Sequence, residues 1–130
     1  MRHIKKYIKN ERGSQLIEFL AVFPMIIFAL LFIWQVALVA YAVVVSEAAA
    51  RDGARVASVE GDFEAAVESS AYGLDLQSVS SSTGNSSYGK NVTVTVVAKV
   101  PTVSVPFLGK IDYDLKADAT MPMEEDETDE

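Results

Sequence analysis

The sequence predicts an α+β protein in which a long hydrophobic N-terminal helix precedes a small domain with a short antiparallel sheet. Two observations support this prediction. No charged residue occurs from Phe19 to Val45. Later in the chain, residues 90–100 and 110–121 each alternate apolar and polar side chains, which is typical of strands that bury one face.

The apolar run is long enough to cross a membrane. As an α-helix it reaches roughly 40 Å, against a hydrocarbon core of about 30 Å. Pro24 and Gln35 are its main interruptions. Pro24 is either a tolerated kink or a point where the helix bends or melts when it leaves the bilayer.

The charge distribution predicts the orientation of this span. The chain of 130 residues has a net charge of −7, but residues 1–13 hold five basic residues and one acid. That segment therefore carries about +4 and the remainder about −11. Basic residues beside a span stay on the cytoplasmic side, so we expect a cytoplasmic N-terminus and an extracytoplasmic C-terminal part. The position of the basic residues beside the span argues against nucleic-acid binding.

Three interpretations fit the N-terminal segment. It could be a secretory signal peptide cut after Ala50, although its apolar run exceeds the usual length of about 7–15 residues. It could be an uncleaved anchor of a bitopic protein with an extracytoplasmic binding domain. Neither interpretation explains Glu18, a lone acid at the edge of the apolar run, where a charge is costly. The third interpretation rests on a short basic leader that ends in Gly13, five residues before Glu18.

This spacing resembles the processing signal of type IV prepilins and pseudopilins. The resemblance implies that a prepilin peptidase cuts between Gly13 and Ser14 and leaves a new α-amine on Ser14. It also implies a role for Glu18 in assembly, because its carboxylate can pair with the positive N-terminus of a neighbouring subunit. Such pairing in a dry helix bundle fixes the axial register between subunits.

A longer pattern is similar to that of the TadE-like pseudopilins of tight-adherence (Flp) pilus systems. It consists of an Arg-Gly-small start, a Glu-Phe pair, a proline within the apolar run and an Ala-Ala-Arg-x-Gly-Ala-Arg segment. The matching residues are Arg12, Gly13, Ser14, Glu18, Phe19, Pro24, Ala49, Ala50, Arg51, Gly53, Ala54 and Arg55. The sizeable C-terminal region and Phe19, where major pilins typically have tyrosine, favour a pseudopilin over a major pilin.

The resemblance implies a minor structural subunit that supports pilus assembly, adherence and biofilm formation. Its implied partners are the prepilin peptidase, a major Flp-type pilin, TadF-like pseudopilins, the inner-membrane assembly platform and membrane lipid. After assembly it would lie in the pilus at the cell surface. The expected segments are a leader over 1–13, a helix over 14–60 with its span at about 19–45, a reduced pilin-like domain over 61–123 and a disordered acidic tail over 124–130.

Beyond the span, the helix is expected to continue in amphipathic form. Val56, Val59, Phe63 and Val67 recur at helical spacing, Gly53 and Gly61 are expected to break or kink the helix, and Asp62 could cap a second helix that runs to about residue 72. Arg51 and Arg55, one turn apart, could reach lipid headgroups or acidic residues of a neighbouring subunit.

The sequence predicts two strands, and it predicts a loop that connects the helices to the first strand. In residues 90–100 the buried face would hold Val92, Val94, Val96, Ala98 and Val100, and in residues 110–121 it would hold Ile111, Tyr113, Leu115, Ala117, Ala119 and Met121. Residues 78–89, rich in serine and glycine, are expected to form a loop. Because two strands alone are marginally stable, we also expect a third, at about residues 76–82. The apolar linker residues Val103, Val105, Phe107 and Leu108 are expected to be buried.

The sequence predicts no catalytic residues, no metal site and no cofactor. Its single histidine, His3, lies in the leader, and it has no cysteine and no glycine-rich phosphate loop. The acidic tail lacks the spacing of a calcium loop. We therefore expect a structural protein that is the substrate of a peptidase rather than an enzyme.

Overall fold

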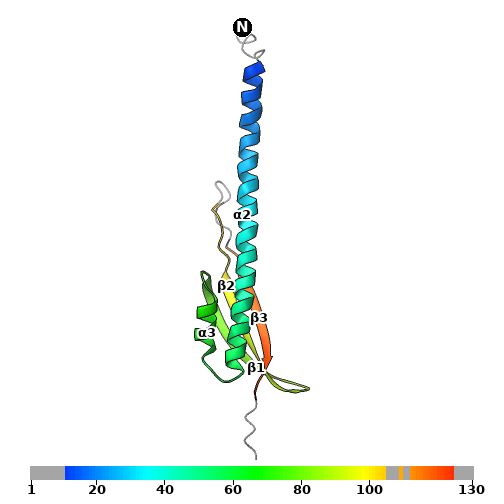
Figure 1. The fold of residues 1–130 in the computed structure, drawn as a ribbon, viewed down its shortest axis with the longest axis vertical. Coiled ribbons are helices and arrows are strands. Elements are labelled where there is room, and N and C mark those ends of the chain that lie inside the picture. The colour runs from blue at the N-terminus through cyan, green and yellow to red at the C-terminus, as the bar shows by residue number, and fades with distance from the viewer. Residues whose placement is uncertain (1–10, 105–108, 110–111, 125–130) are drawn as a thin grey trace, which may run out of the picture. The chain divides into compact units, whose positions relative to one another are not determined.

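The computed structural model describes residues 11–104, 109 and 112–124, and it confirms the α+β prediction. A long apolar helix, α2 (Glu11–Ala57), is followed by α3 (Phe63–Ser70) and three strands, β1 (Asp75–Ser86), β2 (Gly89–Lys99) and β3 (Asp114–Pro122) (Figure 1). The predicted leader up to residue 10, the acidic tail from residue 125 and the linker residues Val105, Phe107 and Leu108 lie outside the described residues.

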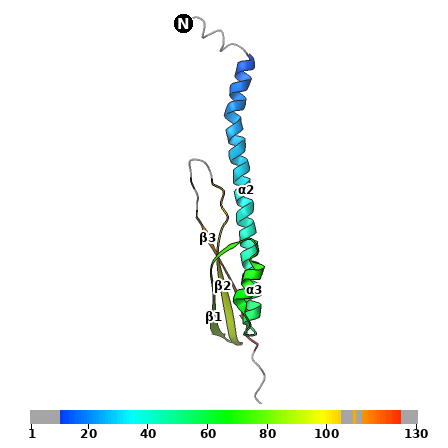
Figure 2. The same cartoon turned by 90° about the vertical axis from the view of Figure 1, so that its left-hand side faces the viewer.

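The chain divides into two compact units, residues 1–36 and 37–130, and α2 contributes to both. In the second unit, α3 and residues 37–57 of α2 lie on one face of the sheet (Figure 2). The three strands are ordered β1-β2-β3, and both neighbouring pairs are antiparallel. The second unit is thus a two-layer structure with helices on one side and a sheet on the other.

Small side chains line the face of α2 that meets the sheet. These buried residues recur at intervals of three and four: Ala42, Ser46, Ala49, Ala50, Gly53, Ala54 and Ala57. Four of them, Ala49, Ala50, Ala54 and Ala57, pack with Val92, Val94, Val96 and Ala117 in one core cluster. Because small side chains let the helix axis lie close to the strands, the valines of the central strand supply most of the bulk of this core.

The structure contradicts the expectation that Gly53 breaks or kinks the helix. Gly53 lies inside α2 and is buried where α3 crosses close to it. A Cβ at this position would lie 2.4 Å from Val67 Cγ2 and 3.1 Å from Val94 Cγ1. The absence of a side chain at Gly53 therefore allows α2, α3 and β2 to come together.

The long helix ends three residues earlier than expected, at Ala57. Glu60 takes a left-handed conformation with φ 57°, the Gly61 N–H donates to Val56 O at 2.9 Å, and the Glu60 N–H donates to Ala57 O at 3.1 Å. This pair of bonds satisfies carbonyls at the helix end and reverses the chain, as in a Schellman motif. Val59, expected on the buried face, lies in this turn and is 57% exposed.

Asp62 caps α3, as the sequence predicts, and three contacts hold this short helix in place. Asp62 Oδ1 accepts a hydrogen bond from the Ala65 N–H at 3.1 Å. Ser70 Oγ donates to Asp52 Oδ2 at 2.6 Å, and Val67 is fully buried. After α3, the Tyr41 hydroxyl donates to Tyr72 O at 2.6 Å, so α2 also holds the segment that follows the C-terminal end of α3.

Replacing Asp62 with alanine should destabilise the second unit by about 1 kcal/mol, because the cap of α3 would lose its acceptor. Urea unfolding of the full-length chain in detergent, followed by proteolysis of the unfolded fraction, measures this change. Asp62→Asn keeps an acceptor and should be close to wild type. An alanine variant as stable as the asparagine variant would contradict a capping role for this side chain.

The sheet contains the predicted third strand, but it is longer than expected and the loop at residues 78–89 is a wrong prediction. β1 extends to Ser86, which pairs with Gly89 across a two-residue turn. Serine and glycine are poor strand formers, yet continuous pairing with the valine-rich β2 overrides this weak local preference. Gly89 adopts φ 124°, a conformation that suits glycine at the start of the return strand.

The predicted alternation holds in β2 and in most of β3. Val92, Val94, Val96, Ala98 and Val100 are all buried. In β3, Ala117 is buried and Leu115, Ala119 and Met121 are partly buried. Tyr113 was expected on this face but is 61% exposed, because β3 begins only at Asp114. Thr93 and Thr120 share a hydrogen bond of 2.7 Å between their hydroxyl groups on the opposite face.

Candidate functional site

The residues predicted to direct processing and assembly lie on the first part of α2. Gly13 and Ser14 are in its first turn, Glu18 is one turn beyond Ser14, and Pro24 follows further along. Four residues of helix correspond to a rise of about 6 Å, so Ser14 and Glu18 lie on neighbouring turns of the same face. The helix therefore places the backbone at Ser14 and the side chain of Glu18 one turn apart on the same face.

This part of α2 exposes apolar side chains on all its faces. Between Ser14 and Val36 only Leu31 and Gln35 are partly buried, and the other side chains are exposed. Phe19 and Phe23 contact each other along one face, with ring centroids 5.7 Å apart. A helix that is apolar all round is stable only in lipid or among other helices.

The same helix is long and apolar enough to cross a membrane. The candidate span runs over Gly13–Ala57, and no residue of its most apolar window is buried inside the protein. This is compatible with a single-pass membrane protein. Length and composition are the basis of this finding, so the sidedness expected from the basic leader stays a prediction.

Pro24 lies within a continuous helix, since α2 runs from Glu11 to Ala57 without interruption. Because proline has no N–H, the carbonyl of Leu20 lacks its usual partner one turn earlier. Glu18 is the only acid between Gly13 and Ser46, and its side chain is exposed. The roles of Gly13, Ser14, Glu18 and Pro24 all depend on what surrounds this helix in the cell.

Arg51 and Arg55 lie on the second part of α2, and both are exposed. Arg51 forms a salt bridge with Glu47, one turn before it, with 3.2 Å between Nη2 and Oε2. Such exposed pairs within a helix add only about 0.3–0.5 kcal/mol of stability. Arg51 thus retains a solvent-facing position on the flank of the helix, and its predicted contact with lipid or a neighbouring subunit remains a prediction.

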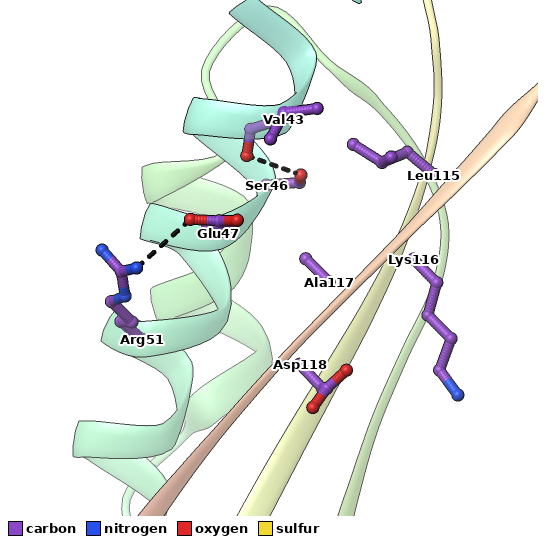
Figure 3. A pocket seen from close by; sticks show the side chains of 8 residues that line it. All are labelled: Val43, Ser46, Glu47, Arg51, Leu115, Lys116, Ala117 and Asp118. Atoms are coloured by element: carbon purple, nitrogen blue, oxygen red, sulfur yellow. Dashed lines mark hydrogen bonds and ion pairs between the residues drawn. The ribbon is translucent and has the colours of Figure 1, made fainter. Parts of the chain in front are cut away.

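An open groove of about 300 Å³ lies between this flank of α2 and β3. Val43 and Leu115 point toward the space between helix and strand, while Lys116 points away from the helix (Figure 3). Glu47 and Arg51 lie on the helix side of the groove. The groove therefore has an apolar floor and a charged rim.

The second salt bridge among the described residues joins Lys99 Nζ to Asp112 Oδ1 at 3.0 Å. Lys99 Nζ donates a hydrogen bond to Asp112, and this bond and the negative charge of Asp112 raise the pKa of Lys99 above its ordinary value. Because the pKa of Lys99 is raised, its contribution to this pair is present at neutral pH and is lost as the pH rises through that raised pKa. Within residues 11–104, 109 and 112–124 there is no group of three or more histidine, cysteine, aspartate or glutamate side chains that could hold a metal ion.

The sequence analysis missed the importance of the small residues between Ala42 and Ala57. The segment "AAARDGARVA" was recognised only as part of a family pattern. Its alanines and glycine, spaced three and four apart, are the signal that a helix face packs closely against other backbone. The arginines within it lie on the opposite side, so one segment serves both the core and the exposed flank.

The comparisons with known proteins concern this same helix. A family described as TadE-like protein matches residues 13–55, from the glycine of the proposed cleavage site to Arg55. No curated protein and no solved structure matches the chain. Residues 13–55 are therefore similar to the TadE-like family, as the sequence pattern predicted.

Proposed function

We propose that this protein is a minor structural subunit, a pseudopilin, of a tight-adherence type IV pilus. The observation that carries the proposal is the exposed apolar helix with Glu18 one turn beyond Ser14, within a segment that matches the TadE-like family. The match and the helix fit a membrane protein associated with a Tad pilus. The helix would hold the subunit in the membrane before assembly and join it to other pilins afterwards.

The proposed maturation step is cleavage between Gly13 and Ser14 by a prepilin peptidase. Hydrolysis of this peptide bond would remove the basic leader and leave an α-amine on Ser14. The amine would lie in the first turn of the new helix, where Glu18 is also favoured by the helix dipole. The Gly13–Ser14 bond is in the first turn of α2, where helices fray most readily, so the peptidase would have access to an extended substrate.

In the assembled state, the exposed apolar faces of α2 would pack against the helices of a major Flp-type pilin and of TadF-like pseudopilins. The assembly platform of the inner membrane would receive the subunit from the lipid. The second unit would then lie on the extracytoplasmic side and reach the cell surface with the pilus. Loss of this subunit is expected to reduce pilus assembly, adherence and biofilm formation.

Mass spectrometry of the mature N-terminus tests the processing step. The protein isolated from cells that contain the prepilin peptidase should begin at Ser14, and the protein from cells without the peptidase should begin at Met1. A start at Met1 in both cells would instead support an uncleaved single-span protein whose outer domain binds a ligand. A start at Arg51 would support secretion of the outer part alone.

A further inference from the structure

The sheet of the second unit has two edges, formed by β1 and β3. In the β2–β3 pairing, Val100 N–H donates to Tyr113 O and Met123 N–H donates to Lys90 O, both at 2.9 Å. Hydrogen-bonding pairs alternate along an antiparallel ladder, so the odd-numbered residues of β3 turn their backbone groups toward β2. The backbone groups of Lys116, Asp118 and Thr120 therefore point to the open edge.

Beyond its first residues, the β1 edge carries none of the usual protection against pairing with another strand. Its segment from Gln77 to Ser86 contains no charged residue and no proline. The one irregularity in its pairing with β2, between Leu76 and Ser78, lies at the start of the strand. Proteins normally protect long edge strands with charges, prolines or bulges, so this edge is suited to strand addition.

Arginines of α2 and glutamates of α3 lie on the helices beside the two edges, and the groove beside β3 also contains Glu47 and Asp118. On the β3 side, Arg51 lines the groove between α2 and β3, and Arg55 is one turn further along the helix. On the β1 side, Glu64 and Glu68 of α3 line a second pocket together with β1. In Figure 1, α3 and β3 lie on opposite sides of α2, and Arg51 lies beside β3 whereas Glu64 and Glu68 lie on α3.

These charged flanks also lie at the same height along the fold. α3 runs back along α2 after the turn, and its level is fixed by the Ser70–Asp52 hydrogen bond and by the close approach of Val67 to Gly53. Glu68, one residue after Val67, therefore lies at the level of the turn of α2 that contains Asp52 and Gly53. Glu64, one turn earlier in α3, is level with the next turn of α2, which contains Arg55.

We propose that this face is an interface between copies of this chain, in which β3 of one copy pairs with β1 of the next and the helix layers join alongside. Arg51 and Arg55 of one copy would then face Glu68 and Glu64 of the other. The inference rests on the proposed function, since a shared membrane makes the α2 helices of all copies run in one direction. β1 and β3 are parallel to each other, and β3 runs in the same direction as the adjoining part of α2 (Figure 1).

This shared direction selects one arrangement of the edges. Antiparallel pairing of β3 with β3, or of β1 with β1, would require a twofold axis that reverses the α2 helices relative to each other. Joining β3 to β1 keeps all helices parallel and is a heterologous contact that can repeat from copy to copy. The β3–β1 contact also places the charged Lys116 and Asp118 of β3 opposite the uncharged segment Gln77–Ser86 of β1. No like charges therefore meet across the strands.

Cross-linking in the membrane of the pilus-bearing cell tests the interface, and the chain has no native cysteine to interfere. Two full-length copies with different tags are expressed together, one with Arg55→Cys and the other with Glu64→Cys, and treated with a short bis-maleimide. The Arg51–Glu68 pair is left intact. A dimer that carries both tags is expected. Two copies with Arg55→Cys, or Arg55→Cys with Tyr88→Cys at the fully exposed hairpin tip, should give at least about tenfold less product.

The charges are tested by reversal. Glu64→Arg with Glu68→Arg should lower β-edge cross-linking, measured with Ser82→Cys in one copy and Thr120→Cys in the other, by at least about tenfold. Adding Arg51→Glu and Arg55→Glu should restore it. Glu60→Arg, which changes an exposed acid in the turn between the helices, is the matched control and should leave cross-linking unchanged.

Two results would overturn the interface while leaving the pseudopilin function standing. One is a protein that starts at Ser14 and enters filaments but gives no mixed-tag dimer. The other is efficient cross-linking between two Arg55→Cys copies, or cross-linking of this protein to another pilin without any mixed-tag dimer. If the protein keeps Met1 and stays out of filaments, the proposed function itself fails, and a mixed-tag dimer in that case would still support the interface between copies.

Discussion

Gly53→Ala should destabilise the second unit by about 1–2 kcal/mol, although alanine is the better helix former. Alanine gains about 0.5–1 kcal/mol over glycine in a helix interior. The new Cβ, however, would lie 2.4 Å from Val67 Cγ2, so α3 must move or the valine must leave its rotamer. Overpacking of this kind costs about 1–3 kcal/mol, and the second contact, 3.1 Å from Val94 Cγ1, leaves little room on the other side.

Urea unfolding of the full-length protein in detergent, followed by proteolysis, measures the change, and a double-mutant cycle identifies its cause. Val67→Ala alone leaves a cavity and should also destabilise the unit. Combined with Gly53→Ala, it removes the atom that clashes. The double variant should therefore lose less free energy of unfolding than the sum of the losses in the two single variants. Strict additivity, or a Gly53→Ala protein as stable as wild type, would show that the close approach of α2 and α3 is not what requires glycine.

Glu18→Ala should leave the protein in the membrane but reduce its incorporation into pili by at least about tenfold. Removing a carboxylate from an apolar helix makes insertion easier. In a dry helix bundle, however, the α-amine of Ser14 would lose its partner, and breaking a buried charge pair by removing one member costs about 3–5 kcal/mol. Quantifying the protein in sheared pili and in the membrane fraction separates the two effects.

Glu18→Gln distinguishes charge from shape at this position. Glutamine keeps the size and the hydrogen-bonding oxygen of the side chain but has no charge, so incorporation should fall nearly as far as with alanine. Met25→Ala changes another exposed side chain of the same helix and should have little effect. If the glutamine variant enters pili as well as wild type, the assembly role of Glu18 does not depend on pairing with a charged amine.

The sequence was most informative where one strong local property decides the structure. The uncharged run of α2 is long and apolar enough to predict a membrane-length helix by itself, and β2 alternates so regularly that its buried face could be assigned residue by residue. Asp62 also acts locally, because a cap needs only the first turn of its own helix. These predictions needed no knowledge of which elements meet.

The sequence was least informative where a residue depends on its neighbours in space. Serine and glycine in residues 78–89 predict a loop, but pairing with β2 makes residues 78–86 part of a strand. Tyr113 continues the alternation of β3 but lies before the strand begins, and is exposed. From its sequence neighbours alone, Gly53 predicts a break in the long helix. Its actual partners, Val67 and Val94, are distant in sequence.

By itself, the sequence determined that the chain has a membrane-length helix, a family-typical Gly13, Ser14 and Glu18 spacing, and an α+β outer part. Hydrophobic length and residue spacing are properties of the chain alone. Only the tertiary structure decided that the small residues of α2 form its packing face, that β1 and β3 are the edges of the sheet, and that Arg51 lies beside β3 whereas Glu64 and Glu68 lie beside β1. Those relations exist only after distant segments pack together, because burial and charge complementarity are set by surfaces rather than by neighbours along the chain.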